Sequence, residues 1–235
     1  CLQVMGASHS AWKELLPVVC EDKRLVILDD SSYEEVVELA TTAFVGTDKS
    51  AGEGLRWLLG PENRSSPPSS SDKTVDCVRY TVKRFTKTTF LWGCVIGCRE
   101  DEGTGQLVSA ALLFPPGAIT DGQVLPWYRQ LVLDASLYWE KSPIESNPQR
   151  FGPHAVTRAR AFMSALASFH AKHASCPHWY VNVLAVHPDH QGKGIRSMML
   201  RTVIEAARNA EPNNVPAYLE CFASKGEYYS KWMEV

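Results

Sequence analysis

The stretch WYVNVLAVHPDHQGKGIRSMMLRTVIEAARN, residues 179–209, decides the fold of this protein. Residues 179–186 are almost all apolar, β-branched or aromatic, as expected of a buried strand. In the next segment Pro188 lacks a donor N–H and biases His187 away from helical backbone angles, which indicates a turn. From Ile195 onward, apolar residues recur at the spacing of one helix face. The stretch therefore predicts a buried strand, a turn and an amphipathic helix.

The turn between this strand and this helix predicts a binding site for phosphate. The first amides of a helix have no intrahelical partner, and the helix dipole favours negative charge at that end. Gly192 and Gly194 lack the side chains that would keep a phosphate away from those amides. A nucleotide P-loop would need Ser or Thr directly after Lys193, and a dinucleotide loop would need glycine in place of Ser197. The site is therefore a phosphate or pyrophosphate site of another kind.

These residues resemble motif A of the GCN5-related N-acetyltransferases, the GNAT superfamily. In that motif a strand and a proline turn precede the pattern [QR]xxGx[GA], and Gln191, Gly194 and Arg196 fill its three positions after LAVHPDH. The sequence departs from the pattern at Arg196, where the family has Gly or Ala close to the cofactor pyrophosphate. Two interpretations of Arg196 stay open: an added phosphate contact or crowding of the site. Residues 107–117, ending in PPG, and AYLE at 217–220 also look like microbial members related to puromycin-type N-acetyltransferases.

The resemblance implies a fold and a cosubstrate. The fold is α/β (α+β), with a mixed, mostly antiparallel central sheet that is splayed at the cofactor site and flanked by helices. The cosubstrate is acetyl-CoA, with no metal. Its pantetheine would pair, like an added strand, with the main chain at Leu184, Ala185 and Val186. Its pyrophosphate would lie against Gln191, Gly192, Lys193, Gly194, Ile195 and Arg196.

Two residues are candidates for acid–base catalysis. Acetyl transfer to an amine needs a proton donor for the departing thiolate and an acceptor for the proton that the amine loses. The resemblance points to Tyr229 as the donor, because YSKW at 229–232 matches a family pattern like YEKL; Tyr228 is the runner-up, and core packing is the alternative role. A phenol with a pKa of about 10 is protonated at neutral pH. Glu220, in a strand beside the cofactor cleft, is the candidate base, with pairing to a cation as its alternative role.

Composition narrows the class of protein. At 235 residues and 45% hydrophobic content, the chain can bury the core of one domain. The net charge of -2 argues against a nucleic-acid partner, and no apolar run reaches the roughly 18–20 residues of a transmembrane helix. Seven scattered cysteines suit the reduced thiols of a cytoplasmic protein. Five histidines fall between 170 and 190, but no cysteine or carboxylate set completes a zinc site with them.

We expect a single domain over residues 1–235, with a mobile polar loop at 61–72 and a helical insertion at 118–178. A capping box at Ser32 and Glu35 starts the first helix. Strands are predicted at 25–28, 89–99, 106–114, 179–186 and 215–222. Helices are predicted at 33–44, within 47–59, at 74–87, within 122–140 with a break at Pro126, and at 155–174, 195–209 and 225–232. The start on Cys1 and an end before the last two family strands indicate a fragment or a processed product.

The sequence thus predicts an acyltransferase: an acetyl-CoA-dependent N-acetyltransferase that acts on a primary amine by direct transfer in a ternary complex. A small-molecule acceptor is expected, because the resemblance is to small-molecule members. The enzyme is expected to be a monomer or homodimer without nucleic-acid or membrane partners. Cys221 as a covalent acetyl carrier is an alternative route. The alternative function is a GNAT-like acyl-CoA-binding or regulatory module without catalysis.

Overall fold

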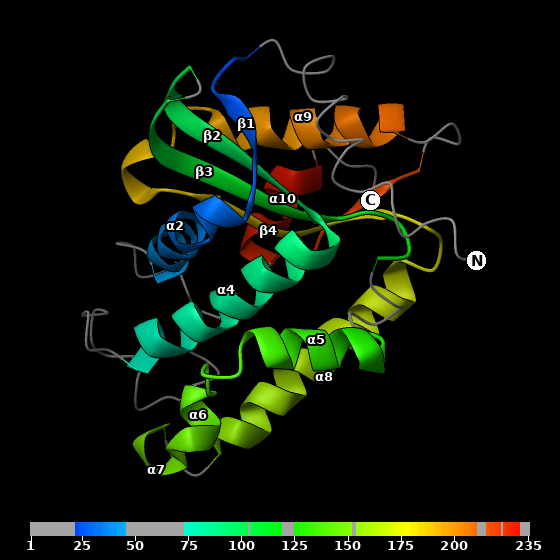
Figure 1. The fold of residues 1–235 in the computed structure, drawn as a ribbon. Coiled ribbons are helices and arrows are strands. Elements are labelled where there is room, and N and C mark those ends of the chain that lie inside the picture. Colours follow the sequence, from blue (N-terminus) through cyan, green and yellow to red (C-terminus); the bar gives the residue numbers. More distant parts are fainter. Residues whose placement is uncertain are drawn as a thin grey trace.

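A five-stranded sheet in the order β1-β2-β3-β4-β5 forms the centre of the protein (Figure 1). The computed structural model describes residues 22–45, 73–102, 104–118, 125–151, 154–210, 215–221 and 223–230. Successive strands are antiparallel from β1 to β4, and β5 is parallel to β4. The strands are β1 (Leu25–Leu28), β2 (Cys94–Asp101), β3 (Thr104–Phe114), β4 (Trp179–Val186) and β5 (Ala217–Tyr218). The mixed, mostly antiparallel sheet is confirmed, although the strand predicted at 215–222 has only two residues.

Helices cover both faces of the sheet. On one face, α2 (Tyr33–Val45) and α4 (Lys73–Trp92) pack on side chains such as Val95 and Ala185. On the other face, α9 (Ile195–Ala210) packs on side chains such as Ile96 and Val181. Because neighbouring strand residues point to opposite faces, adjacent apolar residues fill two separate cores. Helical spacing of apolar residues predicted α2 and α9, and a shorter helix was predicted at 74–87, within α4.

The helix α4 continues into a segment that was predicted to be a strand. The hydroxyls of Thr88 and Thr89 donate to the carbonyls of Arg84 and Phe85, one turn earlier, at 2.7 and 2.8 Å. The helix ends at Gly93, where a Cβ atom would lie 2.2 Å from the carbonyl oxygen of Leu113. The strand prediction for residues 89–93 is therefore wrong. β-Branched threonines can remain helical when their hydroxyls bond to the preceding turn.

At the start of α2, Glu35 contacts residues that are distant in the sequence, where a local capping box with Ser32 was predicted. Asp29 caps the 3-10 turn η2 (Asp30–Ser32), where its side chain accepts a hydrogen bond from the Ser31 amide. The carboxylate of Glu35 instead accepts hydrogen bonds from the Arg99 guanidinium at 2.9 and 3.0 Å. It also accepts one from the Leu107 amide at 3.2 Å. Glu35 thus joins α2 to the β2–β3 hairpin.

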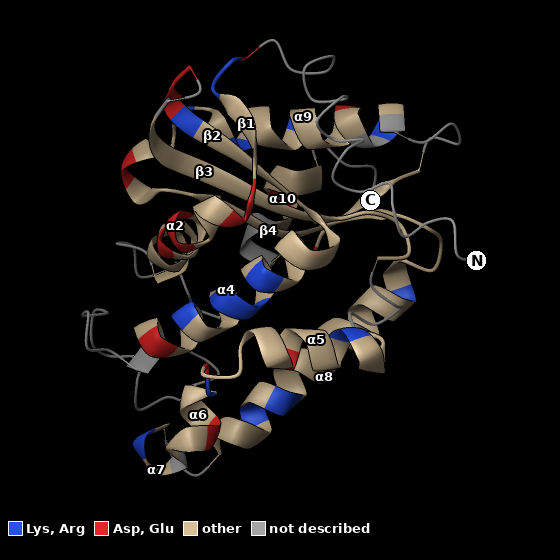
Figure 2. Cartoon of the chain, viewed as in Figure 1, with Lys and Arg blue, Asp and Glu red and all other residues tan. Residues whose placement is uncertain are grey.

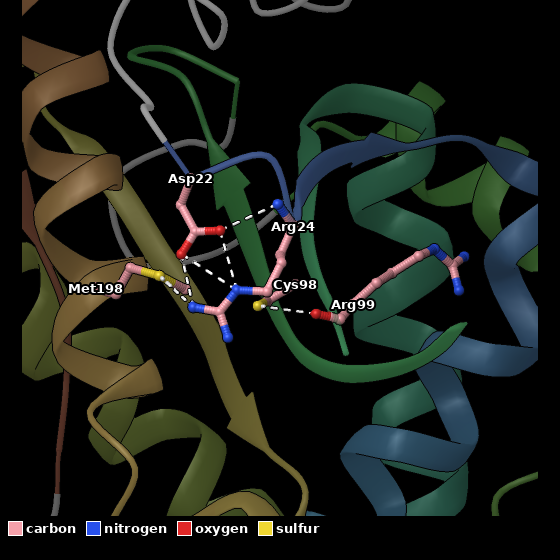
Figure 3. Close-up of polar contacts among 5 residues, drawn as sticks. All are labelled: Asp22, Arg24, Cys98, Arg99 and Met198. Atoms are coloured by element: carbon pink, nitrogen blue, oxygen red, sulfur yellow. Dashed lines mark hydrogen bonds and ion pairs between the residues drawn. The ribbon is translucent and has the colours of Figure 1, made fainter. Parts of the chain in front are cut away.

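Charged side chains link the helices to each other and to the sheet edge. In Figure 2 acidic residues of α2 lie beside basic residues of α4, and Arg79 pairs with Glu38 at 2.6 Å. Figure 3 shows Arg24, just before β1, donating to both carboxylate oxygens of Asp22, with its Nη2 atom 3.6 Å from the sulfur of Met198 on α9. The hydrogen bonds from Arg24 hold the pKa of Asp22 below its usual value. Arg24 therefore ties the edge of the sheet to α9.

Between β3 and β4, the described residues of the predicted insertion at 118–178 form four helices. They are α5 (Trp127–Ser136), α6 (Pro143–Ser146), α7 (Pro148–Phe151) and α8 (Ala155–His173). Pro126 precedes α5, as predicted. The predicted amphipathic helix at 155–174 is present, but its Met163 and Phe169 are 44% and 56% exposed. Its periodicity therefore predicted the helix correctly but not the burial of its apolar residues.

Three further points complete the comparison with the sequence. The helix predicted within 47–59 and the loop at 61–72 fall outside the described residues. The last described helix, α10 (Ala223–Ser230), is the one predicted at 225–232. Among the helices that the structure describes, none combines the length and apolar character needed to cross a bilayer.

Candidate functional site

Strands β4 and β5 form a fork. In the described residues they pair at Trp179 with Ala217 and at Tyr180 with Tyr218, and no further pair follows. On its other side β4 stays paired with β3 as far as Val186. We call the Tyr180–Tyr218 pair and the open edge of β4 that follows it the β4–β5 fork.

A bulge in β4 lies directly after the fork opens. Leu112 of β3 faces Val183, and its neighbour Leu113 faces Val181, so Asn182 is an extra residue on β4. A bulge bends its strand and increases the local twist. The bulge at Asn182 therefore bends β4 just after its described pairs with β5 end.

The open edge of β4 presents main-chain groups at two of the three predicted positions. His187 donates its amide to the Val108 carbonyl of β3, and in an antiparallel pair every second residue points its groups the same way. Ala185 therefore also points toward β3, and its carbonyl accepts a hydrogen bond from the Ser109 hydroxyl at 2.7 Å. The groups of Leu184 and Val186 point to the open edge. An extended ligand can pair there as an added strand.

The turn between β4 and α9 contains two glycines in the left-handed region, directly before the helix. The 3-10 turn η4 (Pro188–His190) leads into Gly192 and Gly194, whose φ angles are +78° and +79°. A Cβ atom on either glycine would meet no protein atom within 4 Å, so the space in front of the turn is open. The first intrahelical hydrogen bond runs from the Met198 amide to the Gly194 carbonyl. The amides of residues 195–197 precede it and have no intrahelical acceptor.

The side chains of the other residues predicted to hold the pyrophosphate make different contacts. Gln191 donates from its side-chain amide to the Val186 carbonyl at 3.2 Å, which holds the turn against the end of β4. Lys193 is exposed at the tip of the turn. Ile195 is buried in the core under α9, so its side chain is unavailable to a ligand and only its amide faces the site. The side chain of Arg196 packs on α10, with its guanidinium carbon 5.3 Å from the centre of the Tyr228 ring.

The two tyrosines of α10 lie beside the first turn of α9. The hydroxyl of Tyr228 is hydrogen-bonded to the Ser197 hydroxyl at 2.8 Å. The Tyr229 ring packs edge-on against it, with centroids 5.2 Å apart. Burial raises the pKa of Tyr229, and the nearby Arg196 charge opposes that shift only in part. Tyr229 is therefore a neutral phenol at physiological pH, as a proton donor must be.

Glu220 lies at the β4–β5 fork, within a cluster of tyrosines and histidines. Its carboxylate accepts hydrogen bonds from the hydroxyl of Tyr180 at 2.7 Å and from that of Tyr218 at 3.4 Å. The Nδ1 atom of His170, on α8, is 3.6 Å from one carboxylate oxygen. The His170 Nε2 atom in turn lies 3.0 Å from Nε2 of His178. Glu220 is 16% exposed and His170 1% exposed.

Burial and the Glu220 charge both raise the pKa values of Tyr180 and Tyr218. Burial, followed by the neighbouring carboxylate, raises the pKa of Tyr180 well above its usual value and that of Tyr218 to about 12. Both phenols therefore remain hydrogen-bond donors to Glu220. The sequence pointed to Glu220 but not to Tyr180, Tyr218 and His170, which contact its carboxylate. Residues 180 and 218 lie on neighbouring strands, and only the strand register brings them together.

His187, His190 and Cys221 are not among the residues that contact Glu220 in the bonds described above. His190 lies 3.2 Å from a carboxylate oxygen of Glu100, and the His187 ring accepts a hydrogen bond from the Asp189 amide. Within the described ranges, no group of three or more His, Cys, Asp and Glu side chains is arranged to hold a metal ion. Burial raises the pKa of the Cys221 thiol, which lowers the fraction of the nucleophilic thiolate. The raised pKa thus argues against Cys221 as a covalent acetyl carrier.

Comparison with known proteins gave a family match over part of the chain. The model of the acetyltransferase (GNAT) family matches residues 148–227, which include β4, the glycine turn, α9 and β5. A solved structure found by comparison is described as histone acetyltransferase HPA2 and related acetyltransferase from Corynebacterium glutamicum. It has 18% sequence identity and a TM-score of 0.47, over 88% of this chain and 81% of that one. Among curated proteins no match was found.

Proposed function

We propose that this chain, whose residues 148–227 match the acetyltransferase (GNAT) family model, transfers the acetyl group of acetyl-CoA to a primary amine of a small molecule. The family match supports acetyl transfer in general. The observation that supports amine acetylation is the Glu220 carboxylate, held by two tyrosine hydroxyls at the β4–β5 fork. The choice of a small molecule rests on the sequence resemblance at residues 107–117 and 217–220.

The proposed binding mode of acetyl-CoA uses the open edge of β4 from end to end. The pyrophosphate contacts the amides of residues 195–197, which have no intrahelical acceptor, and the two glycines leave room for it. The pantetheine runs back along the edge and pairs with Leu184 and Val186. From Val186 to Tyr180 the strand spans about 20 Å at roughly 3.3 Å per residue. A ligand anchored at the turn in this way carries its thioester toward the fork.

The proposed reaction is a direct transfer between the two bound substrates. The ammonium group of the acceptor gives a proton to the Glu220 carboxylate, and the neutral amine attacks the thioester carbonyl carbon. The C–S bond breaks as the C–N bond forms, and the departing thiolate takes a proton from the Tyr229 hydroxyl. The amide nitrogen then loses its second proton to solvent, which also reprotonates Tyr229. General acid–base steps of this kind each contribute about 10²–10⁴-fold to a rate.

The rival function is acyl-CoA binding without catalysis. One observation favours it: Arg196, where the motif departs from the family pattern, lies in the first turn of α9 and packs on Tyr228. A regulatory module would keep the phosphate site and would need no proton acceptor.

Calorimetry with acetyl-CoA, followed by assays of thiol release with a panel of amines, separates these functions. We expect binding of acetyl-CoA and thiol release with at least one amine. Binding without turnover on any amine would support the rival, and failure to bind would contradict both.

Two matched pairs of variants test the residue roles. We expect Glu220→Gln to lower turnover by about 10²-fold or more while acetyl-CoA affinity stays unchanged. Glu227→Gln, at an exposed glutamate of α10, serves as its control. Tyr229→Phe is expected to lower turnover in the same way, whereas Tyr228→Phe retains it. An active Tyr229→Phe variant would remove Tyr229 as the acid.

A further inference from the structure

We propose that the proton acceptor of this enzyme is the Glu220–His170 pair, and that His178 is a positioning residue that fixes the protonation pattern of His170. This inference rests on the proposed function and adds to it the group that shares the proton. The pair joins two distant parts of the chain, since His170 is in the last turn of α8 and Glu220 follows β5.

The protonation pattern follows from the hydrogen bonds, starting at the surface. The Nδ1 atom of His178 lies 2.7 Å from the Cys176 carbonyl oxygen. A carbonyl oxygen only accepts, so Nδ1 of His178 carries the hydrogen. Neutral His178 then has a lone pair on Nε2, which lies 3.0 Å from Nε2 of His170. The His170 Nε2 atom must therefore be the donor.

This pattern leaves a lone pair on Nδ1 of His170, the atom that faces Glu220. In the unprotonated state this lone pair and the carboxylate oxygen are two acceptors 3.6 Å apart. One added proton converts this unfavourable contact into a charge-assisted hydrogen bond. Proton uptake from the acceptor ammonium is therefore favoured at this place, and the proton is shared between the Glu220 oxygen and the His170 nitrogen. No redox or covalent step is needed.

The surroundings of the pair keep Glu220 charged, because hydrogen bonds donated to a carboxylate stabilise its ionised form, and they stabilise a cationic His170. The Tyr180 and Tyr218 hydroxyls both donate to Glu220, from β4 and from β5. The His170 ring packs against both tyrosine rings, with centroid distances of 4.8 and 5.1 Å, and against the His178 ring at 4.8 Å. Aromatic rings stabilise a neighbouring cation when it is desolvated. Glu220, Tyr180, Tyr218 and His178 are the titratable groups that contact His170 in these ways.

Nitrogen-15 NMR of the histidine rings of the full chain tests the pattern without any assay of turnover. At high pH we expect neutral His178 with hydrogen on Nδ1 and neutral His170 with hydrogen on Nε2. On acidification His170 gains its second proton, and Glu220→Gln shifts the midpoint of that step to lower pH because the facing negative charge is lost. A His170 ring that carries its hydrogen on Nδ1 when neutral, or a midpoint unchanged in Glu220→Gln, would overturn the proposal.

Kinetics with two substitutions at one position give the functional test. Gln at 178 keeps a carbonyl that accepts from His170, whereas Phe fills the space without an acceptor. We expect His178→Phe to lower kcat/KM at least about tenfold and to shift its acidic limb, and His178→Gln to restore most of both. His173→Phe, at an exposed histidine of α8, the helix that also carries His170, is the control without effect.

Failure of this inference and failure of the proposed function give different results. Equal pH profiles for His178→Phe, His178→Gln and the native enzyme would remove the histidines from the proton path and leave acetyl transfer intact. Absence of turnover in the native protein on any amine would refute the proposed function, while the NMR pattern would still decide the state of the pair. His170→Phe removes the imidazole of the pair directly. If that variant does not fold, the two His178 variants and the NMR measurement decide whether the histidines share the proton.

Discussion

Replacing Gly194 by alanine separates the strain of the glycine turn from its ligand-binding role. The φ angle of Gly194 is +79°, where an L-residue costs about 1–2 kcal/mol. Gly117, after β3, has a φ angle of +74°, and a Cβ atom on either glycine meets no protein atom within 4 Å. Gly194→Ala and Gly117→Ala should therefore lower the free energy of unfolding by similar amounts, because neither adds a steric clash.

The two variants should differ in their affinity for coenzyme A. A methyl group on Gly194 stands between the incoming pyrophosphate and the amides at the start of α9. Loss of a hydrogen bond to a charged group costs about 1.5–3 kcal/mol, which is about a 10- to 150-fold rise in Kd. Gly117 follows β3 at the end where Phe114 pairs with Tyr180. This is the opposite end of β4 from the glycine turn. The Gly117→Ala variant should therefore bind coenzyme A as tightly as the native protein.

The assay combines calorimetric titration with coenzyme A and urea unfolding monitored by circular dichroism. The unfolding curves show whether the two substitutions are matched in strain. Equal affinities in Gly194→Ala and the native protein would refute the assignment of the turn to the pyrophosphate. An equal loss of affinity in both variants would show that strain, and not the site, controls binding.

Three other substitutions test separate parts of the reasoning. Gly93→Ala places a Cβ atom 2.2 Å from the carbonyl oxygen of Leu113, and we expect it to lower the free energy of unfolding by about 3 kcal/mol in urea. Burial raises the pKa of Tyr180, so folding favours its neutral form. The contribution of this residue to the free energy of unfolding is therefore fully present below a pH of about 10, and above that pH it falls by about 1.4 kcal/mol per pH unit. Tyr180→Phe should therefore make unfolding free energies between about pH 10 and 11 fall less steeply. Arg196→Ala should change the Kd for coenzyme A less than about tenfold, since its guanidinium packs on Tyr228, and a larger loss would show a phosphate contact.

Local patterns predicted most of the secondary structure and half of the site. The glycines at 192 and 194, the strand before them and the helix after them are neighbours in sequence, so their chemistry is readable without a fold. The end of α4 was misread because Thr89 and its neighbours have strand propensity, while the tertiary contact at Gly93 and the hydroxyl bonds to the preceding turn keep them helical. Propensity is a weak signal where such contacts compete with it.

The sequence by itself determined the glycine turn before α9, because a turn and the helix it starts are built from consecutive residues. It also pointed to Glu220 as the candidate base. Only the tertiary structure showed how Glu220 is held. Tyr180 lies 40 residues away and His170 lies 50 residues away, and the register of β4 with β5 and the end of α8 bring them together. The tertiary structure also placed Arg196 on Tyr228, because the side-chain direction of a helical residue depends on what packs beside it.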